Sequence, residues 1–209
     1  MTPALGWVGA AGFTATWVTL GFVSPGYRMW DIVVSSYSPV SQPISGLGLG
    51  VTAPYMNSAF VVFGLAVAAG AWAATGSWRR LVPGHMTRLA RPCVAATGIG
   101  MILCGLFDLE SMTMHSLGFL LAVGFPGLGL LLAGVALRRV QPILASALLA
   151  SGAASLLLLG TFLSTFDAAA AGAGHGVAGL VQRLLVTVVL GAVAVICWGS
   201  QREPSAPAS

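Results

Sequence analysis

Long apolar stretches constrain the fold of this chain more than any other feature. Six of them reach or approach the length of about 20 residues that a helix needs to cross the hydrocarbon core of a bilayer. Hydrophobic residues make up 57% of the chain and its mean hydropathy is +0.93, which excludes a soluble globular protein. We predict an all-α integral membrane bundle with six transmembrane helices, at residues 4–23, 55–74, 93–109, 117–137, 143–166 and 179–198.

These helices are expected to form one domain over residues 1–200. The first apolar stretch has neither the basic n-region nor the A-x-A cleavage pattern of a signal peptide, so we expect it to be retained as a helix. The connection 24–54 is long for a compact bundle and is predicted to be extracytoplasmic. Residues 201–209 are expected to form a short cytoplasmic tail.

Arginines set the expected orientation. All nine basic residues are arginine, which is typical of a bacterial genome rich in G and C. Seven of them lie in two connections and the tail, at Arg79, Arg80, Arg88, Arg91, Arg138, Arg139 and Arg202. Because basic residues in short connections stay on the cytoplasmic side, both termini are predicted to be cytoplasmic, in a multi-pass protein of the bacterial cytoplasmic (inner) membrane. The net charge of +4 then reflects topology, and we expect no nucleic-acid partner.

Carboxylates and histidines gather on the opposite, outer side in this orientation. The outward residues are Asp31, Asp108, Glu110, His115, Asp167 and His175, whereas His85 and Glu203 face the cytoplasm. Acidic residues have little influence on topology, so membrane insertion does not require this asymmetry. Two interpretations remain open. The outer connections tolerate acids because they are wet, or the outer side holds a functional site.

The segment FDLESMTMHS, residues 107–116, concentrates the polar residues. If the third helix continues past Asp108, then Asp108, Ser111 and His115 share one helix face. If the chain turns here, Ser111 is a plausible N-cap for the fourth helix, with Glu110 near the positive end of its dipole. In both geometries Asp108 lies at the apolar boundary, where a carboxylate is costly unless it is paired or solvated. Asp108 is therefore a site candidate.

Arg183 in the first turn of the sixth helix is a candidate partner for these acids. One interpretation is that its side chain snorkels to the outer headgroups. The other is an ion pair or polar clamp inside the bundle, with Asp31, Asp108 or Asp167. His175 and Gln182 would share a face with this cluster if the sixth helix begins early.

The long connection 24–54 is too apolar and aromatic to be disordered. We predict a lid or re-entrant segment over the mouth of the bundle, with Trp30 and Tyr37 at headgroup depth. Ser41, Gln42 and Ser45 supply hydrogen-bonding groups next to the glycines of GLGLG, which allow close backbone approach. A GxGxxG pattern is not present, so no nucleotide is implied.

Pro126 and its neighbouring glycines interrupt the fourth apolar stretch. A proline in a membrane helix frees a backbone carbonyl, which favours a kink bordering a cavity. Close packing between helices is the plainer account of the glycines.

Metal-binding patterns are weak in this chain. The three cysteines, Cys93, Cys104 and Cys197, lie in apolar runs without CxxC spacing, as small buried hydrophobes do. Ser111-x-x-x-His115 is similar to the serine and histidine spacing of membrane-bound ceramidase-like hydrolases, but His175 has no second histidine four residues on. A zinc site would also need Asp108 or Asp167. We therefore expect no metal and no cofactor.

Several segments resemble one family along nearly the whole chain. They are PGY (25–27), VSQPISGLGLG (40–50), YMNSAFVVFGL (55–65), GIGMILCGLFDLE (98–110), HSLGFLLAVGFPGLGL (115–130) and GVAGLVQRLLV (176–186). In this order they are similar to the bacterial membrane-protein family named domain of unknown function 998 (DUF998). The resemblance implies a six-helix fold but no activity, and it marks Ser45, Asn57, Glu110, His115, Gln182 and Arg183 as matching the family's polar pattern. The chain departs from the family at 107–108, where Phe-Pro is frequent, and has one histidine at His115 where two are usual.

The expected function is an integral-membrane enzyme that acts on a lipophilic substrate by acid and base chemistry at an outer pocket. Asp108 or Glu110 would donate a proton and His115 would accept or relay one, with isoprenoid cyclisation of the terpene cyclase type as a candidate reaction. The residues expected to bind substrate are Trp30, Asp31, Tyr37, Ser45, Asn57, Asp167, His175, Gln182 and Arg183. Membrane lipids or a lipophilic small molecule are the expected partners. A non-catalytic lipid-binding or transport accessory protein, and a structural subunit that needs a protein partner, remain alternatives.

Overall fold

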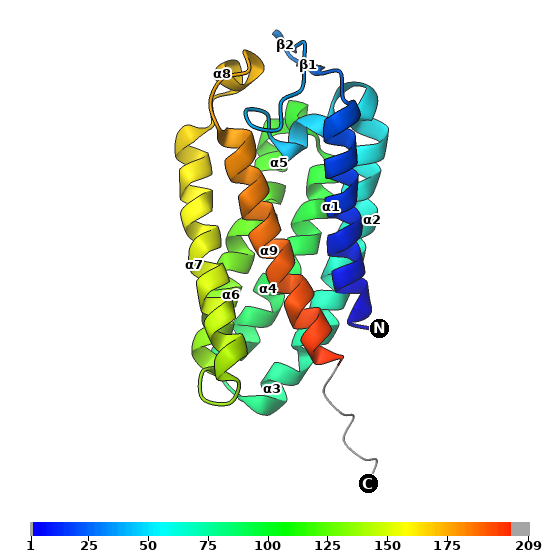
Figure 1. Cartoon of the computed structure of the whole chain (residues 1–209). Coiled ribbons are helices and arrows are strands. Elements are labelled where there is room, and N and C mark those ends of the chain that lie inside the picture. The colour runs from blue at the N-terminus through cyan, green and yellow to red at the C-terminus, as the bar shows by residue number, and fades with distance from the viewer. Residues whose placement is uncertain (1, 202–209) are drawn as a thin grey trace.

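The computed structural model describes residues 2–201 and contains the six predicted membrane-spanning helices. Figure 1 shows them standing side by side in one bundle. Four spans are single helices with bounds close to the prediction, and their apolar composition explains why they form. They are α1 (Ala4–Val23), α2 (Ala53–Ala74), α7 (Pro142–Thr165) and α9 (Ala178–Ser200).

The third and fourth spans differ from their predicted bounds. Helix α4 runs over His85–Leu106, so it begins eight residues before the predicted start at Cys93. Hydropathy marks where lipid begins and not where a helix begins, and the first two turns of α4 carry two arginines. The fourth span begins near Asp108 instead of Leu117, and consists of η4 (Leu109–Ser111), α5 (Met112–Phe119), η5 (Leu120–Gly124) and α6 (Phe125–Leu137).

The long connection folds into two parts. The first is a hairpin in which β1 (Tyr27–Met29) pairs antiparallel with β2 (Ile32–Val34), and Trp30 at its tip has φ +50°. The second part enters the mouth of the bundle as η1 (Ile44–Gly48) and η2 (Gly50–Thr52), and residues 41–49 are all buried. The segment is therefore packed into the bundle in addition to covering it.

Two other short elements complete the connections. After α2 the chain continues through η3 (Thr75–Ser77) into α3 (Trp78–Leu81). Helix α8 (Ala168–Gly172) precedes α9 and packs on the hairpin through contacts of Gly172 with Ile32. Figure 1 shows α8 and the hairpin together at one end of the bundle, with α3 at the other.

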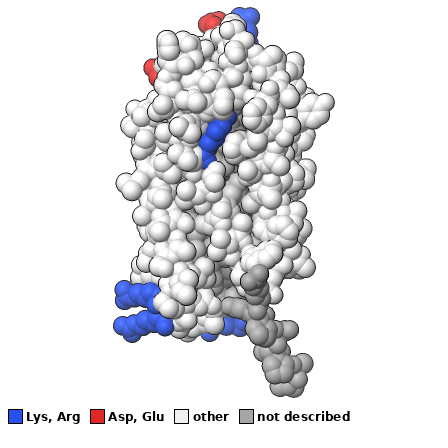
Figure 2. Space-filling model, viewed as in Figure 1, with Lys and Arg blue, Asp and Glu red and all other residues white. Residues whose placement is uncertain are grey.

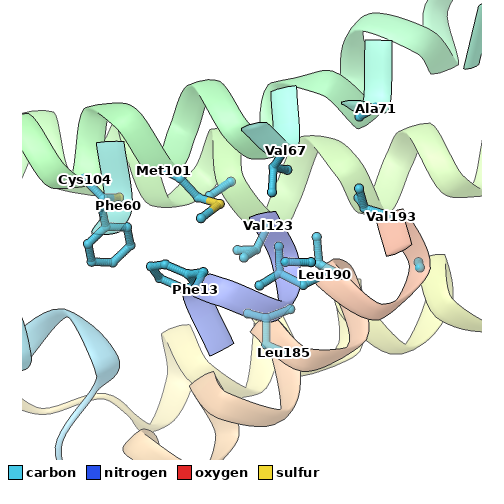
Figure 3. Packing of buried hydrophobic residues seen from close by; sticks show 14 of the residues in the cluster. Phe13, Phe60, Val67, Ala71, Met101, Cys104, Val123, Leu185, Leu190 and Val193 are labelled. Atoms are coloured by element: carbon cyan, nitrogen blue, oxygen red, sulfur yellow. The ribbon is translucent and has the colours of Figure 1, made fainter. Parts of the chain in front are cut away.

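Small residues let the helices approach closely. A Cβ on Gly64 of α2 would lie 2.8 Å from the carbonyl oxygen of Gly98 on α4, so both positions need glycine. Elsewhere larger side chains interlock, as in the pair Phe13 and Phe60, whose ring centroids are 4.8 Å apart (Figure 3). Packing of this kind holds membrane helices together because lipid chains are as apolar as the side chains themselves.

The π-helical turn η5 directly precedes Phe125 and Pro126. Pro126 has no N–H to donate to the carbonyl of Ala122, and a π-helical turn is one way to absorb that loss. Ala122 and Val123 line an internal cavity, which is the part of the kink interpretation that the structure supports. In the next turn Gly127 packs on Ser155 of α7, so for this glycine the explanation by close packing between helices holds.

Charges separate to the two ends of the bundle. Figures 1 and 2 show that α1 begins and α9 ends at the end where basic side chains gather. We name this the arginine end and define it by Arg79, Arg80, Arg88, Arg91, Arg138 and Arg139. The opposite loop end carries the hairpin, α8 and the acidic residues Asp31, Asp108, Glu110 and Asp167, together with one basic residue, Arg28 of β1. Apart from Gln201, the predicted tail 201–209 lies outside the described residues.

Candidate functional site

The buried part of the long connection is fixed to the beginning of α9 by hydrogen bonds. The Leu180 N–H donates to the Val40 carbonyl over 2.9 Å, and the Ile44 N–H donates to Gln182 Oε1 over 2.6 Å. Gln42 Nε2 donates to the Ala171 carbonyl over 2.5 Å. These bonds satisfy backbone groups that lipid could not satisfy, which is the condition for irregular backbone at membrane depth.

Arg183 is a polar clamp within this assembly. Its Nη1 donates to the carbonyl oxygens of Pro39, Gln42 and Gly179, at 2.7, 2.8 and 2.9 Å, and its Nη2 donates to the Tyr37 hydroxyl. The side chain is only 8% exposed, so the snorkelling interpretation is wrong. Arg183 does act as a polar clamp inside the bundle, but its partners are neutral oxygens and not the expected carboxylates. Within residues 2–201 none of the expected carboxylates Asp31, Asp108 or Asp167 pairs with Arg183.

Tyr37 is buried inside the protein, so its side chain does not face the lipid headgroups. Its hydroxyl donates to the Pro43 carbonyl over 3.1 Å and accepts from Arg183. Burial raises the pKa of Tyr37 above its ordinary value, and the Arg183 guanidinium offsets part of that rise. Trp30, by contrast, is exposed at the tip of the hairpin.

Ser45 and His115 form a buried pair at the inner end of this segment. Ser45 Oγ lies 2.8 Å from His115 Nε2, and both residues are less than 7% exposed. His115 Nδ1 lies 2.7 Å from the Phe107 carbonyl oxygen. Because a carbonyl only accepts, Nδ1 carries the proton and Nε2 is left to accept from the Ser45 hydroxyl.

The break between α4 and the fourth span creates this geometry. Helix α4 ends at Leu106, and Phe107 is extended with φ −127°, so its carbonyl leaves the helical ladder. The chain then turns through η4 into α5, which returns His115 toward that carbonyl. Cys104 Sγ lies 3.7 Å from the His115 carbonyl oxygen and ties the same two segments together.

Ser45 lines an internal cavity of about 30 Å³. Among residues 2–201, the side chains that bring oxygen or nitrogen atoms to its wall are those of Ser45, Thr97 and Gln182. Thr97 Oγ1 donates to the Val94 carbonyl of its own helix, whereas Gln182 Oε1 accepts from Ile44. Apolar side chains from α1, η1, α2, α4, α5, η5 and α9 form the rest, including Phe13, Phe60, Met101, Val123 and Leu190 (Figure 3).

No hydrogen bond within residues 2–201 joins Asp108 or Glu110 to His115, although the Asp108 carboxylate lies close enough to interact electrostatically with the imidazole. A shared helix face required α4 to continue, and it stops before Asp108. Asp108 Oδ1 instead accepts from the Glu110 N–H over 3.0 Å as the cap of η4, and Glu110 is exposed. The alternative turn is present, but Ser111 at the N-cap of α5 makes no side-chain capping bond. Neither carboxylate lines the cavity.

The remaining predicted residues lie apart from the cavity. Asp31 is exposed in the hairpin, and Asp167 Oδ1 accepts from the Ala170 N–H over 2.7 Å as the cap of α8. His175 is exposed before α9 begins, so its expected face with Gln182 is wrong. Asn57 Nδ2 donates to the Gly48 carbonyl over 3.1 Å and so holds the end of η1.

The Ser45–His115 pairing was not predicted from the sequence. The resemblance to the family marked both positions, but nothing in the spacing of two residues 70 positions apart indicates a contact. Within residues 2–201 no group of three or more His, Cys, Asp and Glu side chains is placed to hold a metal ion. A hydroxyl bonded to an oriented imidazole is instead the arrangement of a nucleophile with its general base.

Comparison with curated proteins and with solved structures found no significant match. A family model described as "Protein of unknown function (DUF998)" matches residues 7–199, which is nearly the whole chain. The chain is thus a multi-pass membrane protein that belongs to the DUF998 family.

Proposed function

We propose that this protein is an integral-membrane enzyme of the bacterial cytoplasmic membrane that transfers or hydrolyses an acyl group of a lipophilic substrate. Ser45 would be the nucleophile and His115 the general base. The hydrogen bond between Ser45 Oγ and His115 Nε2 is the observation that carries this proposal. By the distribution of arginines, the site opens on the extracytoplasmic side.

The chemistry requires no further group to move a proton. As Ser45 Oγ attacks the carbonyl carbon of an ester or amide, His115 Nε2 takes the hydroxyl proton. His115 then returns the proton to the leaving alkoxide or amine as the carbonyl carbon–heteroatom bond breaks. The same imidazole then deprotonates water or an acceptor alcohol, which attacks the acyl carbon. The bond to Ser45 Oγ breaks, the imidazole returns the proton to Ser45, and the acyl group is released. The Phe107 carbonyl holds the imidazole in the required tautomer throughout, the role that a carboxylate has in a triad.

Gln182 supports the negative charge that develops on the carbonyl oxygen. Its Oε1 accepts from the Ile44 N–H, which fixes the amide orientation, and its side chain lines the same cavity as Ser45. Because Oε1 is the bonded oxygen, the Nε2 amide is the donor end of this side chain at the cavity wall. Donors fixed in place before reaction are the usual means of stabilising an oxyanion.

The apolar wall of the cavity supports a lipophilic substrate. A volume of about 30 Å³ admits roughly two water molecules. An acyl or isoprenoid chain therefore enters only when the surrounding side chains move apart. The re-entrant segment that carries Ser45 is one wall of the cavity, and it is held to α9 by hydrogen bonds instead of continuous helix.

Acid-initiated cyclisation is less well supported by the geometry. Protonating an alkene needs a carboxylic acid that faces an apolar pocket, but Asp108 and Glu110 both lie outside the cavity wall. Non-catalytic lipid binding needs only the cavity, and would leave the Ser45–His115 bond with a purely structural role.

Covalent labelling separates these functions. We would treat the purified protein in detergent with a long-chain alkyl fluorophosphonate and measure the intact mass, then locate the adduct by peptide mass spectrometry. One adduct on Ser45 is expected, absent from Ser45→Ala and present in Ser111→Ala, a serine that is exposed at the same end. Equal labelling of Ser45→Ala and the wild type, or none in either, would contradict the proposed nucleophile.

A further inference from the structure

Three buried donors without partners lie around the Arg183 clamp. They are Arg183 Nε, Trp17 Nε1 and Ser41 Oγ, none of which has a hydrogen bond within residues 2–201. Buried polar atoms are nearly always satisfied, because leaving one unpaired costs its desolvation free energy. Three unpaired donors in one region therefore indicate an acceptor that the chain itself does not supply.

The guanidinium of Arg183 has one unpaired edge, which is covered from solvent, so a ligand reaches it only when neighbouring side chains move apart. Nη1 is fully used by three carbonyl oxygens, and Nη2 gives one N–H to the Tyr37 hydroxyl. The N–H of Nε and the second N–H of Nη2 remain. In arginine these two nitrogens form the fork that binds carboxylate or phosphate with two parallel hydrogen bonds.

The charge of Arg183 also has no counter-ion within residues 2–201. All its protein partners are neutral, and the side chain is only 8% exposed. A buried cation without a counter-ion is costly, and an anion seated on the unpaired edge removes that cost. The carbonyls orient the guanidinium, and the rings of Trp17 and Tyr37 offset part of its charge, but none of these groups is a counter-ion.

Trp17 and Ser41 belong to the two elements that pack against Arg183. The Trp17 ring centroid lies 5.5 Å from Arg183 Cζ, on α1 opposite α9, and Trp17 is half-buried. Ser41 directly precedes Gln42, whose carbonyl accepts from Arg183. The donors thus lie between α1, α9 and the re-entrant segment, and Figure 2 shows basic atoms reaching the surface on the upper half of the front face, below the terminal carboxylates.

We propose that Arg183, Trp17 and Ser41 form a binding site for a phosphate or carboxylate group. Resting on the proposed function, this group is the anionic headgroup of the lipophilic substrate. Gln42 at the clamp and Ser45 at the nucleophile are three residues apart, a reach of about 10 Å along the chain. A lipid held by its headgroup at Arg183 has its first carbonyl within range of Ser45.

The test measures binding without catalysis, in the Ser45→Ala background. Native mass spectrometry of the detergent-solubilised protein would be used to titrate phosphatidic acid, diacylglycerol with the same acyl chains, and inorganic phosphate. Phosphatidic acid is expected to bind at least about tenfold more tightly than diacylglycerol, because the phosphate accepts charge-assisted hydrogen bonds. Displacement of phosphatidic acid by inorganic phosphate would identify the free anion as a ligand, and no displacement would identify the lipid headgroup.

Two tryptophan variants provide the matched comparison. Trp17→Phe keeps the ring but removes the unpaired N–H, and should weaken phosphatidic acid about tenfold. Trp7 also has a buried Nε1 without a partner, but it packs on Trp198 at the arginine end. Trp7→Phe should therefore leave the affinity unchanged.

Equal loss in both tryptophan variants, or equal binding of phosphatidic acid and diacylglycerol, would overturn the anion site. Because the binding experiment uses Ser45→Ala protein, the outcome of this experiment does not depend on whether Ser45 is labelled. The anion site and the proposed nucleophile can therefore fail separately.

Discussion

Ser45 Oγ and His115 Nε2 lie 2.8 Å apart although 70 residues separate them in the chain. The contact depends on two breaks in regular structure, the entry of η1 into the bundle mouth and the end of α4 at Leu106. Both residues are buried, and a buried hydroxyl or imidazole needs a hydrogen-bond partner. Here the two side chains are hydrogen-bonded to each other. The pair is therefore fixed in place before any substrate binds.

His115 should control the reactivity of Ser45. His115→Asn keeps a polar side chain of similar reach but removes the base, and a positioned general base contributes about 10² to 10⁴ in rate. We expect the rate of fluorophosphonate labelling at Ser45 to fall by that factor. His85→Asn, an exposed histidine at the beginning of α4, is the control and should label at the wild-type rate. A His115→Asn rate within twofold of the wild type would show that the bond is only structural.

Gln182 should matter for turnover more than for substrate binding. Gln182→Glu keeps an oxygen for the Ile44 N–H but removes the donors that face the cavity. Loss of an oxyanion donor costs about 10² to 10³ in kcat, and KM should change little. Thr97→Val alters another cavity residue whose hydroxyl is bonded to Val94, so its kcat should stay near the wild type. A rise in KM at constant kcat in Gln182→Glu would assign Gln182 to binding alone.

Asp108 should be dispensable for catalysis. Asn is as good a cap as Asp, so Asp108→Asn should retain the turn at η4 and change the free energy of unfolding by less than about 1 kcal/mol. Labelling of Ser45 should stay within about threefold of the wild type. Complete loss of product with normal labelling would instead support the acid-initiated chemistry expected from the sequence.

Tyr37 should make the fold sensitive to alkali. Burial raises the pKa of Tyr37, so its neutral form stabilises the folded state fully below the unfolded value of about 10. That stabilisation is lost as pH rises from there through the folded value, because the ionised phenolate is disfavoured inside. Thermal melts in detergent at pH 8 and pH 10.5 should show a smaller decrease in Tm for Tyr37→Phe than for the wild type.

The same variant has a cost at pH 8. Tyr37→Phe leaves Arg183 Nη2 and the Pro43 carbonyl without their shared partner, which should destabilise the protein by about 1–3 kcal/mol. Tyr55→Phe, an exposed tyrosine on α2, should match the wild type at both pH values. Identical pH dependence in wild type and Tyr37→Phe would exclude Tyr37 as the source of the alkaline sensitivity.

Hydropathy was sufficient to predict the spans because lipid contact is a local property of each helix. The bounds of α1 match the predicted 4–23, whereas the first turns of α4 were missed because Arg88 and Arg91 lie outside an apolar window. The break at Asp108 was one of two alternatives, and the sequence alone did not choose between them. The choice between them depends on how α5 packs against α4, which is a tertiary contact.

The site was predictable only in part. Family resemblance marked Ser45, His115, Gln182 and Arg183, which line the cavity or hold its wall. Asp108 and Glu110 were grouped with His115 because they are close in sequence, but the hydrogen bonds of His115 go to Phe107 and Ser45, and Asp108 interacts with it only electrostatically. The partners of Arg183 are backbone carbonyls, which every residue has, so no pattern of side chains indicates them.

Lipid composition tests the central claim most directly. Untargeted mass spectrometry would compare lipid extracts of native-host cells that carry the wild type, a deletion, Ser45→Ala or Ser111→Ala. A lipophilic product that disappears in the deletion and in Ser45→Ala, together with accumulation of its acylated precursor, is the predicted result. Ser111→Ala should match the wild type. Extracts of Ser45→Ala cells that match the wild type while the deletion differs would contradict catalysis by Ser45.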